Sequence, residues 1–232
     1  MTRFFLCVFF ILSTATSIEF AYGESRVWRI ASLQWQPYSG SDLVNEGRSI
    51  EVLRHVLAKS DIELQVDFFP WKRAKDYANN KDYIGYFPAW PNVLDPGFIP
   101  SPIVDWSWIS VIHNKDIPVM ETGLDQLFSD YRVAIISSYS YPKEVFAAAK
   151  ANPERTYKIS DEYSMLMMLS HQYVDIGITD GDVIRYYADK LGISNVSTAF
   201  HLMRMPLVVA LRDTPDNQGV IEEITRMLNS EL

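Results

Sequence analysis

The order of strand-like and helix-like segments constrains the fold of this chain more than any other feature. Apolar residues alternate with others along residues 27–33, as in a half-buried β-strand, and recur at helical spacing along 50–59. A second alternating segment follows at 63–69, then a helical pattern at 71–80 and a short strand at 83–87. Such alternation of strands and helices is typical of a parallel sheet covered by helices. The first part of the chain is therefore predicted to be an α/β unit.

The same rhythm begins again in the second half of the chain. A strand-like run at 131–137 is followed by helical patterns at 141–152 and 161–172. Another strand is predicted at 174–179 and another helix at 181–192. These segments predict a second α/β unit of similar construction.

Two long extended runs join the two units. The run at 101–112 leads out of the first unit, and the run at 205–213 leads back to it, ahead of a final helix at 214–230. No low-complexity linker separates the units, and two crossing strands form a hinge. The fold class is therefore predicted to be α/β with two lobes and two crossover hinge strands. Lobe 1 is predicted to comprise residues 24–109 and 205–232, and lobe 2 residues 110–204.

The first 23 residues have the pattern of an export signal. Arg3 precedes an apolar run at 4–12, and small residues at Ala21 and Gly23 predict cleavage after Gly23. The apolar run is shorter than the roughly 20 residues needed to span a bilayer. The single cysteine, Cys7, lies in this segment. The exported chain would therefore depend on its core rather than on disulfides, and its expected compartment is the periplasm.

Composition argues against several classes of function. The formal net charge is −8, whereas nucleic-acid-binding proteins carry basic patches. The sequence contains no phosphate-binding loop, no dinucleotide-binding glycine motif and no nucleophile elbow. The histidines have no metal-ligand spacing; they are His55, His113, His171 and His201. We therefore expect a protein that is not an enzyme and that needs no cofactor or metal.

Aromatic residues make up 13% of the chain and gather in short clusters. Several clusters lie beside Pro, Gly or Ser at places where strands are predicted to end. Such positions line ligand pockets, although aromatic residues also fill cores. The clusters are found at residues 35–38, 68–71, 83–91, 106–108 and 139–141.

Taken together, the segments resemble the extracellular solute-binding proteins of family 3, the periplasmic receptors of polar amino acid ABC transporters. The stretches that carry the resemblance are RIASLQWQPYSG (29–40), GRSIEVLRHVL (47–57), VDFFPWKRA (66–74), SPIVDWSWISVI (101–112), YRVAIISSYSYP (131–142) and YVDIGITDGDVIRYY (173–187). The resemblance implies a monomer with the type II periplasmic binding protein-like fold. It further implies two lobes that close on a small polar solute, and a transporter permease in the inner membrane as partner.

The candidate binding residues follow from the predicted strand ends. In open α/β sheets the ligand lies at the carboxyl ends of the strands, next to helix N-termini. Residues at these positions are Tyr38, Trp71, Arg73, Pro88, Ala89, Trp90, Ser138, Tyr139, Ser140, Tyr141 and Asp180.

The sequence also departs from the family at the expected site. The family's ligand-clamping arginine, in a Thr-x-x-Arg stretch after the third strand, is absent from AWPNV at 89–93. The turn that usually reads Gly-Thr-Thr is SSYSY at 137–141. The aspartate that accepts the ligand's amino group in the family is matched by Asp180. The cation-binding half of the family's site is thus present, and the usual anion clamp is missing.

Arg73 and Asp180 each allow two interpretations. Arg73 lies in the first turn of the predicted helix 71–80, where cations oppose the helix dipole. It is either a solvated cation or a substitute clamp for a ligand carboxylate, and the helical period turns it about 200° from Trp71. Asp180 either caps the following helix or contacts the ligand. Our hypothesis is that Asp180 binds a cationic group and Arg73 a carboxylate.

The start of the predicted helix 161–172 is acidic. Ser160 is predicted to be its N-cap, and Asp161 and Glu162 complement the helix dipole.

Three functions remain open on these grounds. The first is a solute receptor for an ABC transporter. The second is a ligand-binding sensory protein that acts on a membrane receptor. The third, least favoured, is a periplasmic dehydratase-like enzyme on the same fold, for which Asp180 is the obvious acid or base in the cleft.

Overall fold

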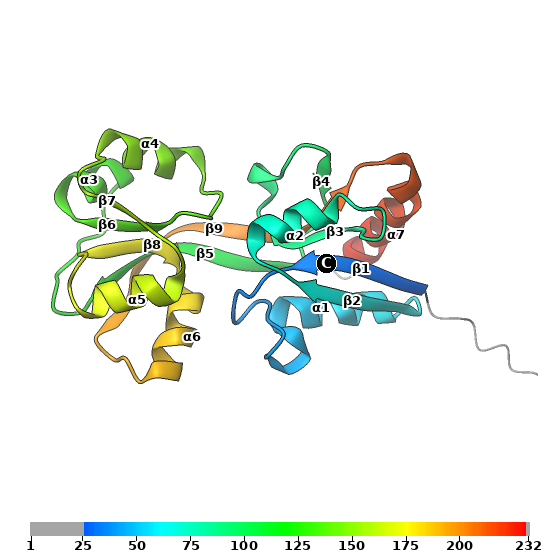
Figure 1. Ribbon diagram of the computed structural model, residues 1–232, viewed down its shortest axis with the longest axis horizontal. Coiled ribbons are helices and arrows are strands. Elements are labelled where there is room, and N and C mark those ends of the chain that lie inside the picture. Colours follow the sequence, from blue (N-terminus) through cyan, green and yellow to red (C-terminus); the bar gives the residue numbers. More distant parts are fainter. Residues whose placement is uncertain (1–25, 231–232) are drawn as a thin grey trace, which may run out of the picture.

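A computed structural model describes residues 26–230 and shows two α/β lobes placed end to end (Figure 1). The predicted signal segment, residues 1–23, lies outside the described residues. Lobe 1 contains β1 (Arg26–Ser32), α1 (Arg48–Ala58), β2 (Ile62–Phe68), α2 (Trp71–Ala78), β3 (Gly85–Ala89), β4 (Phe98–Pro100) and α7 (Gln218–Asn229). Three short 3-10 helices complete it: η1 (Val44–Glu46), η2 (Pro91–Val93) and η3 (Pro215–Asn217). No helix in the described range is long and apolar enough to cross a membrane.

Lobe 2 repeats the arrangement with a second set of elements. These are α3 (Leu124–Asp130), β6 (Val133–Ile136), α4 (Lys143–Ala151), β7 (Thr156–Ile159), α5 (Glu162–Ser170), β8 (Ile176–Asp180) and α6 (Gly181–Leu191). In lobe 1, β1 pairs in parallel with β2 and β3, and in lobe 2, β6 pairs in parallel with β7 and β8. The short β4 pairs antiparallel with β9.

Two long strands connect the lobes: β5 (Asp105–Asn114) and β9 (Val196–Arg212). They pair antiparallel with each other from Asp105↔Leu207 to Asn114↔Val196. From Val208 onward β9 pairs instead with β3 of lobe 1, and from Ile109 onward β5 pairs also with β8 of lobe 2. The strand order is β2-β1-β3-β9-β5-β8-β6-β7, so both lobes share one continuous sheet (Figure 1). The predicted α/β fold with two crossover hinge strands is confirmed.

Successive side chains of a strand point to opposite faces of the sheet, so one strand contributes residues to a core on each face. In β6, Val133 and Ile135 pack with α3 and α4 residues, whereas Ala134 and Ile136 pack with α5 and α6 residues. Lobe 1 is built in the same way. Ile30 joins the core under α1 and α7, and the next residue, Ala31, joins the separate core under α2.

Several elements differ from the sequence prediction. Strand β9 begins at Val196, nine residues before the predicted run. The first part of the strand was not predicted, because two register shifts against β5 interrupt its alternation of buried and exposed residues. The short elements β4, α3 and β7 were not predicted. Ser160 was predicted to be the N-cap of α5, and this was wrong: Asp161 is the N-cap, and its carboxylate accepts the Ser164 N–H at 2.7 Å. The lobe boundaries within the hinge strands stay a prediction.

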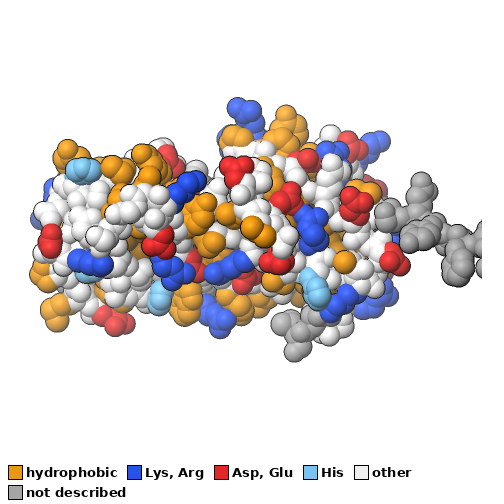
Figure 2. Space-filling view, turned by 90° about the horizontal axis from the view of Figure 1, so that it is seen from below, with side chains coloured by type: hydrophobic (Ala, Val, Ile, Leu, Met, Phe, Trp, Pro, Cys, Tyr) orange, Lys and Arg blue, Asp and Glu red, His pale blue; other side chains and the backbone are white. Residues whose placement is uncertain are grey.

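The surface has no large region of a single charge on the face seen in Figure 2. Basic and acidic side chains lie close to one another across the middle of the molecule, where the lobes meet, with hydrophobic side chains scattered between them (Figure 2).

We predict that Gly85→Ala destabilises the protein by about 1–3 kcal/mol, because overpacking forces backbone shifts. A Cβ at Gly85 would lie 1.9 Å from the carbonyl oxygen of Ala210 on the neighbouring β9. Urea denaturation measures the change. The control is Gly219→Ala in α7, where a Cβ meets nothing within 4 Å. That substitution should leave stability unchanged or raise it by about 0.4–1 kcal/mol. Equal effects at both positions would contradict the packing argument.

Candidate functional site

The carboxyl ends of β1, β2 and β3 in lobe 1 face Ser138, Tyr139 and the start of α5 in lobe 2. Two adjoining cavities of about 340 Å³ and 60 Å³ lie between them. Residues from both lobes line each cavity. We call these two cavities together the cleft. The residues that line both cavities are Leu33, Trp35, Trp71, Ser138 and Tyr139.

Seven of the candidate residues named from the sequence line this cleft. They come from the start of α2, the end of β3 and the loop after β6. These residues are Trp71, Pro88, Ala89, Trp90, Ser138, Tyr139 and Ser140. The structure therefore brings seven of the residues named from strand ends together around one cleft, and that they bind a ligand stays a prediction.

Four further candidates do not line the cleft. Tyr38, Tyr141 and Asp180 are almost fully buried, and Arg73 is exposed. The Tyr141 hydroxyl donates to the Ile178 carbonyl at 2.6 Å and accepts the Ile136 N–H at 3.0 Å. It thus ties the ends of β8 and β6 together inside lobe 2.

Arg73 points away from the cleft on the exposed face of α2. Ala74 and Ala78 form the buried stripe of this helix, as its spacing predicts, and Arg73 makes no hydrogen bond or ion pair with the described residues. Lys75 is the cation of this helix that does line the cleft. Its ammonium lies 3.1 Å from Asp95 and 5.7 Å from the centre of the Trp71 ring.

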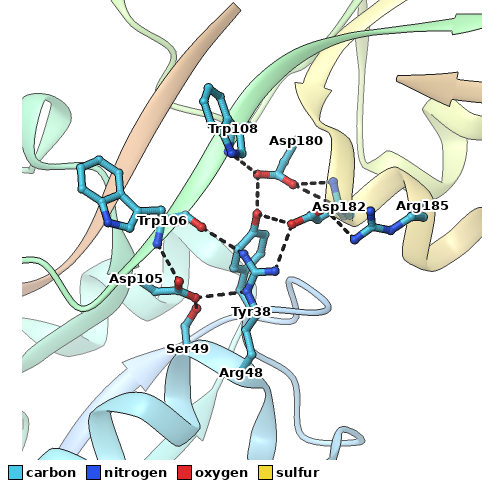
Figure 3. Close-up of polar contacts among 10 residues, drawn as sticks. Tyr38, Arg48, Ser49, Asp105, Trp106, Trp108, Asp180, Asp182 and Arg185 are labelled. Atoms are coloured by element: carbon cyan, nitrogen blue, oxygen red, sulfur yellow. Dashed lines mark hydrogen bonds and ion pairs between the residues drawn. The ribbon is translucent and has the colours of Figure 1, made fainter. Parts of the chain in front are cut away.

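Asp180 is 1% exposed, and donors of the protein itself surround its carboxylate (Figure 3). Oδ1 accepts the N–H groups of Asp182 and Val183 at 2.8 and 3.2 Å, which caps α6. Oδ2 accepts the Trp108 N–H at 3.0 Å and the Tyr38 hydroxyl at 2.9 Å. Burial raises the pKa of Asp180 to about 6, and the hydrogen bonds from Trp108, Tyr38 and Val183 oppose that rise.

The Tyr38 hydroxyl crosses from lobe 1 to lobe 2, and Arg48 of α1 reinforces this contact. The Arg48 guanidinium lies 4.3 Å from the centre of the Tyr38 ring and 3.0 Å from Asp182 of lobe 2 (Figure 3). It also contacts Asp105 at 3.2 Å and donates to the Trp106 carbonyl at 3.0 Å, at the start of β5. We call the contacts of Tyr38 and Arg48 with Asp180 and Asp182 the interlobe latch.

Sequence reasoning missed two residues that stand inside the cleft, Trp35 and Glu162. Glu162 is the first residue of α5, and its Oε1 accepts the Tyr139 hydroxyl of its own lobe and the Trp35 indole N–H of lobe 1 at 3.3 Å. Burial raises the pKa of Glu162, while the hydrogen bonds from Tyr139 and Trp35 oppose that rise. Trp35 belongs to the aromatic cluster at residues 35–38, which follows β1, so the sequence could have identified it as a cleft residue. Glu162 was considered only as a complement to the helix dipole.

Among residues 26–230, side-chain hydrogen bonds join the lobes at the latch, between Trp35 and the pair Tyr139 and Glu162, and from the Tyr187 hydroxyl to Gln36 at 3.1 Å. The Trp90 ring of lobe 1 also packs edge to face against Tyr139 of lobe 2, with ring centres 5.6 Å apart. Within residues 26–230, no three His, Cys, Asp or Glu side chains are grouped so that they could hold a metal ion.

Comparison with solved structures finds the same fold. A histidine kinase sensor domain with similarity to periplasmic binding proteins aligns with a TM-score of 0.72 and 12% identity, over 88% of this chain and 90% of that one. An ancestral arginine-binding protein bound to arginine aligns with a TM-score of 0.71 and 14% identity, over 89% and 93%. The GluR0 ligand-binding core with L-glutamate aligns with a TM-score of 0.69 and 13% identity, over 90% and 95%.

At these identities the comparisons show the fold. The chain has the two-lobed fold of the type II periplasmic binding proteins, which is the fold that the sequence resemblance implied. No family model matches the sequence, and no curated protein is similar enough to count as a relative.

We predict that Tyr38→Phe lowers the free energy of unfolding by about 1–3 kcal/mol, because it removes a hydrogen bond to a buried carboxylate oxygen that then keeps only the Trp108 N–H. The substitution keeps the ring under Arg48 and removes only the hydroxyl that donates to Asp180. Urea denaturation measures the loss. The matched control is Tyr77→Phe, because Tyr77 is exposed and its hydroxyl has no partner among the described residues. Equal, negligible effects of the two substitutions would show that the Tyr38–Asp180 bond adds no stability.

Proposed function

We propose that this protein is a periplasmic solute-binding protein that closes its two lobes around a small polar solute, an amino acid or a related compound. The observation that carries the proposal is the cleft itself, which has one wall in each lobe. Its lining contains aromatic faces, a buried carboxylate and the N-terminal ends of α2 and α5. Convergent polar groups in a largely apolar pocket are typical of small-molecule sites.

The hinge supplies the motion that this function needs. Within residues 26–230 the backbone passes between the lobes through β5 and β9 alone, so bending of these two strands would open the cleft. A solute that contacts both walls favours the closed arrangement over the open one. This is a population shift that stems from different affinities for the two arrangements, and it involves no chemical step.

The proposed partner of the closed form is an ABC transporter permease, to which a monomeric receptor delivers its solute. The support is the family resemblance of the sequence together with the fold. A sensory role is the alternative, in which the closed form acts on a membrane receptor. The likeness to a histidine kinase sensor domain favours this alternative. Either role uses the same cleft and the same closure.

We predict that Ser138→Trp abolishes solute binding and leaves the free energy of unfolding unchanged. Ser138 lines both cavities and is exposed to them, so an indole at this position fills the cleft without entering a core. A thermal-shift screen over amino acids, polyamines, organic acids and aromatic compounds first identifies a solute. Isothermal titration calorimetry then compares the variant with the unmodified protein.

The control for this variant is Ser129→Trp, an exposed position in α3 that lines neither cavity. It should bind the solute as the unmodified protein does. Binding that survives Ser138→Trp would place the solute outside the cleft. If no compound in a broad screen binds, the proposed function is contradicted.

A further inference from the structure

Glu162 is a buried carboxylate without a cationic partner. It is 8% exposed and lines the larger cavity at the N-terminal end of α5. Its two side-chain donors, Tyr139 and Trp35, are neutral, and no Lys or Arg of the described chain forms an ion pair with it. Both donors use the same oxygen, Oε1, although a carboxylate has about four acceptor sites. An uncompensated buried charge is costly, and a bound cation would offset that cost.

Three aromatic rings form a cluster next to this carboxylate, and two of them, Trp35 and Tyr139, donate to it. Trp35, Trp90 and Tyr139 contact one another edge to face, with ring centres 5.6–6.4 Å apart. All three line the smaller cavity, and Trp35 and Tyr139 line the larger one as well. Electron-rich ring faces attract cations, including quaternary ammonium groups and guanidinium groups. The rings and the carboxylate thus favour the same kind of ligand.

The other charges of the cleft do not cancel that of Glu162. Lys75 is the cation in the lining, and its ammonium already pairs with Asp95 at 3.1 Å. Asp161 also lines the cleft and adds a second carboxylate, which caps α5. Arg73, the cation expected from the sequence, lies outside the lining. The uncompensated charge of the cleft is therefore negative.

We infer that the solute of this cleft carries a cationic group, an ammonium or a guanidinium, which binds the Glu162 carboxylate among the rings of Trp35, Trp90 and Tyr139. This inference rests on the proposed function and names its ligand class. Glu162 thus takes the role that the sequence hypothesis gave to Asp180. The carboxylate of Asp180 is already occupied by donors of the protein itself.

The experiment uses pairs of compounds that differ in one cationic group. The pairs are arginine and citrulline, lysine and norleucine, norleucine and hexanoate, and choline and its uncharged carbon analogue, so that one pair differs in the α-ammonium itself. Isothermal titration calorimetry compares each pair on the unmodified protein and on Glu162→Gln. We expect the cationic member of at least one pair to bind more tightly. Glu162→Gln should weaken that binding by about 30-fold or more, because it removes one side of a buried charge pair.

The matched control is Glu144→Gln. Glu144 also lies in the first turn of a lobe 2 helix, but it is exposed and lines neither cavity. This variant should keep the preference for the cation. Equal binding within every pair, or a preference that survives Glu162→Gln, would overturn the inference. If a neutral or anionic solute binds instead and Ser138→Trp blocks it, the proposed function stands without this ligand class.

A second readout separates recognition from a structural role. Burial raises the pKa of Glu162 in the folded protein, so ionising it at neutral pH costs stability that is present in acid. Glu162→Gln should therefore keep or raise the melting temperature of the ligand-free protein, whereas a structural role for the charge predicts a lower melting temperature.

The affinity for choline, whose charge does not titrate, should fall as the pH is lowered through the raised pKa of Glu162. The groups that act electrostatically on Glu162, or that it acts on, are Tyr139 and Tyr141 after β6, Asp180 of β8 and Tyr187 of α6, and the neighbouring residue on α5, Asp161, acts on Tyr187 as well. Burial raises the pKa of all three tyrosines, so they stay neutral. Glu162→Gln retains Asp180, and loss of the pH dependence in this variant assigns the dependence to Glu162. A dependence that persists would contradict the assignment.

Discussion

The buried carboxylate of Asp180 is the interaction on which the arrangement of the lobes depends. A carboxylate inside a protein must have donors around it, and Asp180 receives them from three parts of the chain. The N–H groups of α6 fix the start of that helix, the Trp108 N–H fixes β8 beside β5, and the Tyr38 hydroxyl brings lobe 1 against lobe 2. The donor from lobe 1 is present only while the lobes are together. One side chain therefore links the local structure of lobe 2 to the closed arrangement of the whole molecule.

In the proposed closure, the latch and the cleft involve different residues. The latch joins the lobes through groups that the protein supplies, with Arg48 bridging α1, β5 and α6. The cleft instead brings an aromatic cluster and Glu162 together, and there the charges of the protein do not balance. Closure without a solute satisfies the first set of contacts and leaves the second incomplete. A cationic solute would supply the missing contacts of Glu162 and the aromatic cluster. Binding would therefore stabilise the closed arrangement.

The sequence predicts much of the fold and about a third of the residues that line the cleft. Regular alternation in β1, β2 and β6 and the spacing in α1 and α2 are strong local signals. The strand-end rule names Trp90 and Tyr139, and both line the cleft in the structure. The length of β9 could not be predicted, because pairing with a distant strand, and not local alternation, holds residues 196–204 extended. Asp180 was correctly located at the end of a strand. Its donor from lobe 1, the Tyr38 hydroxyl, depends on how the two lobes pack together, which the sequence does not reveal.

The charges at the start of α2 illustrate the same limit. Lys72 and Arg73 oppose the helix dipole, which suggested a bound anion. In the structure both are exposed to solvent, where the penalty is small, and Lys72 pairs with Asp76 at 3.1 Å. What positions α2 is the close packing of Ala74 and Ala78 on the sheet. Glu162 was overlooked because an acidic residue at the start of a helix is already explained by its favourable interaction with the helix dipole.

The distance between the lobes, measured with and without solute, tests the central claim most directly. Spin labels at Lys81→Cys in lobe 1 and Glu154→Cys in lobe 2 occupy exposed positions, and the described residues contain no other cysteine. Pulsed dipolar spectroscopy on this doubly labelled protein then gives the distribution of interlobe distances. If the lobes close on a solute in the cleft, a bound solute shifts a broad distribution to a single shorter distance, and Ser138→Trp prevents the shift. A distribution that stays the same while the solute demonstrably binds would contradict this account.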